Sequence, residues 1–176
     1  AIQMMVADMA STTHLKAKWM MGDMGDRGWF LSNLRPSQQM RNALFLNSGT
    51  HRFHEISALA GVSSSDWTWS VLFGDLDCDG REDLFVTNGV PRFDMNPDLV
   101  EKFRKLSKLR MDRQLEEEVR SIPPFPERNL AFRNRPGLRF ERATEWGLEA
   151  LGVSHGAALA DLDRDGDLDL VVSNLN

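Results

Sequence analysis

The sequence predicts an all-β protein built from four-stranded antiparallel meanders, the blades of a β-propeller. The first observation is an internal repeat, because an acidic segment at Asp75–Asp83 recurs in register at Asp161–Asp169. The second is an Asn-x-x-Phe-x-Asn segment, which occurs at Asn42–Asn47 and again at Asn129–Asn134. Short apolar runs flank these segments, as strands do. Meanders of short strands repeated in series are typical of propeller blades.

Each repeat unit is expected to contain four strands. The predicted strands are residues 69–74 and 156–160 for the first, 84–87 and 170–173 for the second, 43–46 and 130–133 for the third, and 53–57 and 139–143 for the fourth. Glycine-containing segments at Asn47–Gly49 and Asn134–Gly137 join the third strand to the fourth and are typical hairpin turns. Residues 5–8 resemble one more second strand, so the chain starts and ends within a unit.

Residues 1–176 therefore form one partial propeller of about two blades. A closed ring needs roughly four to eight blades. We expect the chain to be a segment of a longer propeller, whose remaining blades lie in the same or a neighbouring chain.

Two insertions, roughly residues 9–41 and 89–128, interrupt the repeat between the second and third strands. The first insertion is rich in methionine, which we expect to fill space beneath a loop. The second is predicted to hold one helix, Pro97–Arg120, because proline starts it and apolar residues follow at helical spacing. Both insertions are expected to leave neighbouring blades on the same side and to pack on one another.

Composition excludes several classes of protein. With 41% hydrophobic residues the chain can form a real core, so it is not disordered throughout. No apolar run is long enough to span a membrane as a helix. The net charge of −5 comes from the two acidic segments, and no basic stripe suggests contact with nucleic acid. The single cysteine excludes an intrachain disulfide.

The two acidic segments are predicted to be loops that each bind one calcium ion. Aspartates stand at loop positions 1, 3, 5 and 9, glycine at position 6 permits a sharp bend, and the carbonyl at position 7 faces the same centre. Many hard oxygen ligands in a flexible loop favour Ca²⁺ over Mg²⁺. The predicted ligands are Asp75, Asp77, Asp79, the main-chain carbonyl of Arg81 and Asp83 in the first loop, and Asp161, Asp163, Asp165, the carbonyl of Asp167 and Asp169 in the second.

Other uses of these residues are less well supported by the sequence. An EF-hand needs an acidic residue at position 12, where this chain has Val86 and Val172. A glycosidase needs two carboxylates that face one substrate, whereas the clustered carboxylates here already belong to repeated ion sites. Trp67 and Trp69, just before the first loop, either pack between blades or face a ligand.

The loops, the Asp-Leu-x-Val-x-Asn strand after each loop, and the segment Asn42–Asn47 together resemble the FG-GAP or VCBS repeat. This is the calcium-loop repeat of integrin α-subunit propellers. The pattern Asn-Ser-Gly, Phe, Glu and Ala-Gly-Val over residues 47–62 is similar to the cartilage-acidic-protein-like branch, whose bacterial members often carry an ASPIC/UnbV domain.

The resemblance implies a seven-bladed ring in a secreted, cell-surface or periplasmic protein. It also implies a binding or adhesion scaffold for a protein or glycan rather than an enzyme. The alternative is that the propeller belongs to a secreted glycan hydrolase or lyase, with catalytic residues in the insertions or in further blades.

Overall fold

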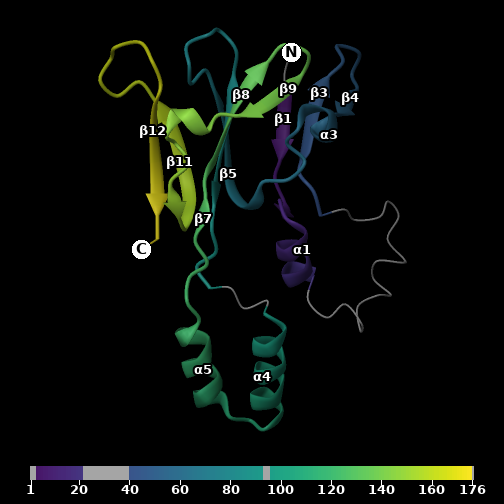
Figure 1. Cartoon of the computed structure of the whole chain (residues 1–176), viewed down its shortest axis with the longest axis vertical. Helices are drawn as coiled ribbons and strands as arrows, with labels where there is room; N and C mark the ends of the chain where they lie inside the picture. The colour runs from purple at the N-terminus through teal and green to yellow at the C-terminus, as the bar shows by residue number, and fades with distance from the viewer. Residues whose placement is uncertain (1–2, 22–39, 93–95, 176) are drawn as a thin grey trace.

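The structure is a computed structural model that describes residues 3–21, 40–92 and 96–175 (Figure 1). All of its strand pairs are antiparallel. The strands are β1 (Gln3–Val6), β2 (Met9–Ala10), β3 (Ala43–Asn47), β4 (Phe53–Glu55), β5 (Asp66–Gly74), β6 (Asp83–Asn88), β7 (Glu127–Arg128), β8 (Leu130–Arg135), β9 (Arg139–Arg142), β10 (Leu151–Gly152), β11 (Ser154–Ala160) and β12 (Asp169–Asn174).

The described residues include one complete blade. Strands β5, β6, β8 and β9 lie in that order in one sheet, and the short strand β2 extends it at the β5 edge. In the register of this sheet, Val86 lies opposite Val71 on one side and Leu130 on the other. The predicted all-β fold and the sequential meander are therefore confirmed.

Partial units lie on both sides of the complete blade. Strands β1, β3 and β4 form a three-stranded sheet before it, and β11 and β12 form a hairpin after it. Strand β6 is buried along its whole length, because it is paired on both edges and covered on its faces. Alternate residues of a strand point to opposite faces, so β6 contributes to contacts with both neighbouring units.

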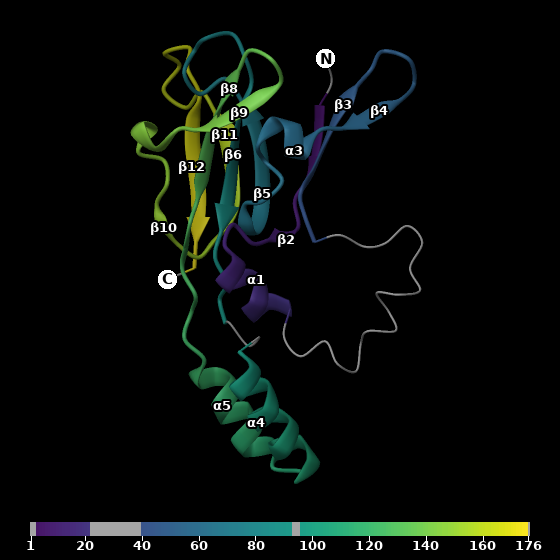
Figure 2. The same ribbon diagram turned by 45° about the vertical axis from the view of Figure 1, so that its right-hand side comes forward.

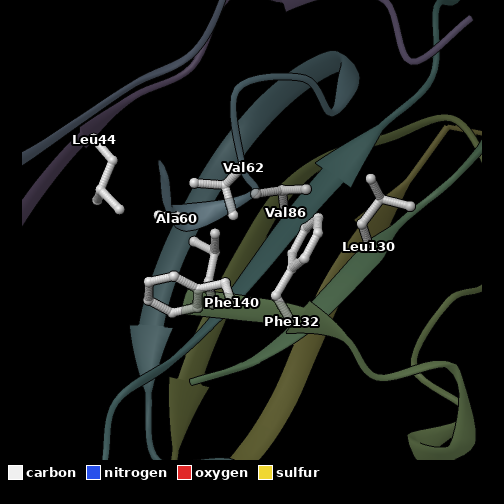
Figure 3. Close-up of a cluster of buried hydrophobic side chains, with 8 residues drawn as sticks. Leu44, Ala60, Val62, Val86, Leu130, Phe132 and Phe140 are labelled. Atoms are coloured by element: carbon white, nitrogen blue, oxygen red, sulfur yellow. The ribbon is translucent and has the colours of Figure 1, made fainter. Parts of the chain in front are cut away.

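The main core lies between the three-stranded sheet and the complete blade (Figure 3). Leu84 and Val86 of β6 point into it, together with Phe132 of β8. The first unit contributes Leu44 and the turn after β4. The buried cluster is Leu44, Ala60, Val62, Leu84, Val86, Leu130, Phe132 and Phe140. Apolar packing between successive sheets is thus the main source of stability here.

A buried asparagine before each third strand repeats the same hydrogen bonds. Asn42 Oδ1 accepts the N–H of Asp8 at 3.0 Å, and Asn129 Oδ1 accepts the N–H of Asn88 at 3.0 Å. These bonds satisfy backbone groups where the second strand of a unit ends. Because Asp8 and Asn88 occupy equivalent places, residues 5–8 are indeed the counterpart of residues 85–88.

Each fourth strand is followed by a short helical turn. The turns are α3 (Ser57–Ala60) and the 3₁₀ turn η2 (Thr144–Trp146), and each ends at a glycine with positive φ. The prediction that a strand continues to residue 57 is therefore wrong. Gly61 and Gly147 are required here because the helix ends in the left-handed conformation, which glycine adopts without strain.

The second insertion contains two helices instead of the predicted single helix. They are α4 (Pro97–Lys108) and α5 (Asp112–Ser121), which lie side by side (Figures 1 and 2). The helix stops because Arg110 adopts a φ of 52°, with the N–H of Arg110 bonded to the Ser107 carbonyl and that of Met111 to the Leu106 carbonyl. This is a Schellman motif without glycine. Folding back brings α4 and α5 into contact, and Lys102 of α4 pairs with Glu118 of α5 at 2.6 Å.

The first insertion begins with β2 and the helix α1 (His14–Met21), and the predicted packing of most of its methionines lies outside the described residues. Helices α1, α4 and α5 all lie at the end of the sheets opposite the acidic loops (Figures 1 and 2). Among the described residues, no helix is both long and apolar enough to cross a membrane.

Candidate metal centres in the acidic loops

The two acidic segments form loops at the same end of neighbouring sheets (Figure 1). The first joins β5 to β6 and the second joins β11 to β12, and both have the same backbone. At loop position 4, Cys78 and Arg164 have φ values of 56° and 65°, and at position 6, Gly80 and Gly166 have φ values of 84° and 99°. The glycine at position 6 therefore permits the bend that the sequence predicts.

In each loop the structure brings together the aspartates at positions 1, 3 and 9. Ligand atoms of Asp75, Asp77 and Asp83 all lie within 4.8 Å of one another. The same holds for Asp161, Asp163 and Asp169. Each group could hold a metal ion, since the oxygens converge on one centre.

The other predicted ligands lie outside these two groups. In the first loop, Asp79 accepts the N–H of Arg81 at 3.0 Å and forms an ion pair with its guanidinium. In the second, Asp165 accepts the N–H of Asp167 at 3.1 Å. Ligation by Asp79, Asp165 and the carbonyls of Arg81 and Asp167 stays a prediction.

Backbone hydrogen bonds hold the carboxylates in place. Asp75 accepts the N–H of Gly80 at 2.8 Å, and Asp161 accepts that of Gly166 at 3.2 Å. At position 9, Asp83 accepts the N–H of Leu76 at 3.0 Å, as Asp169 does from Leu162 at 2.8 Å. The first and last aspartates therefore tie the ends of each loop together and leave other lone pairs facing the centre.

The first loop has an oxygen that fits a bound cation. Asp77 Oδ1 is buried and lacks a hydrogen-bond partner among the described residues, whereas Oδ2 accepts a hydrogen bond from Arg133 Nε at 2.7 Å. A buried carboxylate oxygen without a donor is costly. A cation in the centre of Asp75, Asp77 and Asp83 would remove this cost.

The clustered negative charges in the loops also favour a bound cation. Burial raises the pKa of Asp83, and the charges of Asp77 and Asp79 add to this rise, although the N–H groups of Asn134 and Leu76 oppose it. In the second loop, the hydrogen bond and the charge of Asp165 raise the pKa of Asp167. Carboxylates that repel one another are relieved by a nearby cation.

The raised pKa of Asp83 predicts a pH effect in the absence of divalent cations. A carboxyl group with a higher pKa in the folded state binds protons preferentially there, so its contribution to the free energy of unfolding falls as pH rises. The fall begins near the ordinary value of 3.8 and ends above the raised value.

This effect can be measured by denaturant unfolding in chelator between about pH 4 and pH 7. The difference in the free energy of unfolding between the Asp83→Asn variant and the parent should grow in favour of the variant as pH rises. The exposed Glu117→Gln change removes the same charge from α5 and serves as the control. A constant difference for Asp83→Asn across this range would contradict the prediction.

Comparison with known protein families supports the predicted repeat around the first loop. A family model described as an FG-GAP-like repeat covers part of the chain. Residues 30–86 match this repeat. The FG-GAP-like match contains β3, β4, β5 and the first acidic loop, and it supports the predicted repeat family. The second loop lies beyond the match, so its assignment depends on the internal repeat. No curated protein matches the chain.

Sequence reasoning missed two groups that shape the first loop. Arg133 pairs with Asp77, and the N–H of Asn134 donates to Asp83 at 2.8 Å, so β8 supports the loop from the side. The sequence holds one signal for this contact. In the third strand, Arg133 occupies the place that Leu46 has in the preceding unit.

Trp67 and Trp69, just before the first loop, contact neighbouring groups, but 46% of Trp69 is exposed, so the choice between packing and a ligand-facing role stays a prediction. The Trp69 ring centroid lies 4.4 Å from that of His155 in β11, and Trp69 Nε1 donates to the Gly89 carbonyl at 2.5 Å. Trp67 lies beside Trp69, with ring centroids 6.5 Å apart. Trp69 therefore joins the complete blade to the next unit.

Proposed function

We propose that each acidic loop binds one calcium ion, and that the ions stabilise the blades of an extracytoplasmic propeller that serves as a binding scaffold. The observation that carries this proposal is the pair of three-carboxylate groups at equivalent places of the repeat. The buried, donorless oxygen of Asp77 supports it independently.

Calcium fits these loops better than magnesium does. Calcium accepts six to eight oxygens in flexible geometry, whereas magnesium keeps several waters and uses fewer protein ligands. Asp75, Asp77 and Asp83 would hold the first ion, and Asp161, Asp163 and Asp169 the second. The aspartate at position 5 and the carbonyl at position 7 would complete each set. A bound ion would offset two of the negative charges of the carboxylates and fix the two ends of the loop.

The proposed role as a binding scaffold rests on the repeat in which these loops occur. The FG-GAP-like match over residues 30–86 supports a propeller scaffold, and we propose that this blade belongs to a seven-bladed ring of the cartilage-acidic-protein-like branch. Millimolar calcium outside the cytoplasm would fill loops of modest affinity. The insertions, which lie at the end opposite the ions, would contact a protein or glycan ligand. We propose binding rather than catalysis.

Thermal unfolding in chelator and in excess calcium tests the ion sites. A ligand that binds only the folded state at about 100 times its Kd stabilises by about 2.7 kcal/mol for each site. We therefore expect calcium to raise the Tm by several degrees and magnesium to raise it less.

Matched variants separate the two loops. Asp75→Asn and Asp161→Asn should each remove about half of the calcium-induced rise in Tm, and the double variant should remove nearly all of it. The rise, rather than the Tm itself, is the readout because these aspartates also accept backbone hydrogen bonds. Glu117→Gln is the control. A Tm indifferent to calcium, with no calcium retained in equilibrium dialysis, would refute the proposal.

A further inference from the structure

The first loop has a fixed positive charge beside its carboxylate cluster. The guanidinium of Arg133 donates from Nε to Asp77 Oδ2 at 2.7 Å, and its Nη1 lies 3.1 Å from Glu145 Oε1. Its carbon lies 4.9 Å from the centroid of the Trp146 ring, which places the cation over the aromatic face. Only 22% of the Arg133 side chain is exposed. Three contacts therefore hold this charge in one position.

Arg133 differs from its counterpart in the other copy of the repeat. The third strand of the preceding unit has Leu46 at the same place, between the same phenylalanine and asparagine positions. In the described part of the chain, the ion pairs that reach the acidic loops are those of Arg81 and Arg133, and both belong to the first loop.

A guanidinium bound to a ligand carboxylate has two effects on a calcium site. It partly neutralises the three clustered carboxylates, so the loop stays assembled when calcium is absent. It also repels a divalent cation a few ångströms away, which weakens calcium binding. Both effects reduce the free energy by which calcium stabilises the folded state.

We propose that Arg133 is a built-in cation that lowers the calcium affinity of the first loop and makes the stability of that loop less dependent on calcium. This inference rests on the proposed function, that both loops bind calcium. The first loop then keeps its shape when calcium falls.

The test uses the full chain in an Asp161→Asn/Asp163→Asn background, which leaves the first loop as the responsive site. Tm is measured in chelator and in saturating calcium, and calcium affinity is measured by titration. We expect Arg133→Leu to lower Tm in chelator more than in calcium, so the calcium-induced shift widens. Calcium should bind about threefold to tenfold more tightly, and added salt should reduce this gain.

Two further variants and a control sharpen the result. Arg133→Gln keeps a neutral donor for Asp77 and should widen the shift even if the leucine variant does not fold. Arg133→Lys keeps the charge and should leave the shift nearly as in the parent. Arg135→Leu removes an equal charge from β8, where Arg135 pairs with the exposed Glu141, and should leave the shift unchanged.

Three outcomes would overturn the inference. If Arg133→Leu and Arg133→Gln lower Tm equally in chelator and calcium, the arginine has only a structural role. If the shift shrinks, Arg133 positions Asp77 for the ion instead of competing with it. If the parent background shows no shift at all, the proposed function fails for this loop and this inference fails with it.

Discussion

Replacing Lys16 with methionine is expected to lower the free energy of unfolding by about 3–5 kcal/mol. The Lys16 ammonium lies 2.9 Å from Asp66 Oδ2 and 2.7 Å from Glu127 Oε1. The carboxylate side chains are only 11% and 5% exposed. Without the ammonium, two nearly buried carboxylates would be left without their cation, which is far more costly than the loss of a surface ion pair.

This ion network joins three segments that are distant in the sequence. Lys16 belongs to α1 of the first insertion, Asp66 begins β5, and Glu127 lies in β7 at the end of the second insertion. Burial lowers the pKa of Lys16, but hydrogen bonds and charges of Glu127 and Asp66 outweigh it and raise the pKa. The N–H of Trp67 donates to Glu127, and Thr12 donates to Asp66. The network thus fastens α1 to the end of the complete blade.

Denaturant unfolding measures the effect, with Lys18→Met as the control because Lys18 is exposed on the same helix. Combining Lys16→Met with Asp66→Asn and Glu127→Gln should recover part of the lost stability, since no charge then remains buried. A deficit of under about 0.5 kcal/mol would show that this network behaves as a surface ion pair.

The strands and loops were predictable because their signals are local. Each acidic loop has glycine at the position that needs a positive φ, and apolar runs flank it on both sides. The repeat added a second source of information. Asn42 and Asn129 look like ordinary polar residues alone, but their recurrence before a third strand marks a place with one structural role, which the matching hydrogen bonds confirm.

The remaining features depend on contacts between distant parts of the chain. The break between α4 and α5 contains no glycine or proline, and Arg110 adopts a positive φ as the two short helices pack together. The network of Lys16, Asp66 and Glu127 and the pair of Arg133 with Asp77 likewise follow no local pattern. Spacing could predict which carboxylates form a loop, but it could not show which cations the fold would place beside them.

Gly89→Ala is expected to lower the free energy of unfolding by about 3 kcal/mol or more, through two additive costs. Gly89 follows β6 with a φ of 117°, a conformation that side chains with a Cβ rarely adopt. A Cβ there would lie 2.4 Å from the Gly152 carbonyl oxygen and 2.7 Å from Val153 Cα. Backbone atoms cannot move aside as a flexible side chain can, so the contact between the complete blade and the next unit would have to open.

Gly137→Ala separates the two costs by denaturant unfolding. Gly137 has a φ of 88° in the turn between β8 and β9, but nothing lies within 4 Å of a Cβ built there, so alanine meets only the conformational cost of about 1–2 kcal/mol. The excess cost at Gly89 therefore measures how tightly successive units pack. Because Trp69 also donates to the Gly89 carbonyl and its ring lies against that of His155, opening this contact should change the surroundings of Trp69 and therefore its fluorescence. Equal costs at Gly89 and Gly137 would mean that neighbouring units separate easily, and that each blade gains little stability from the next.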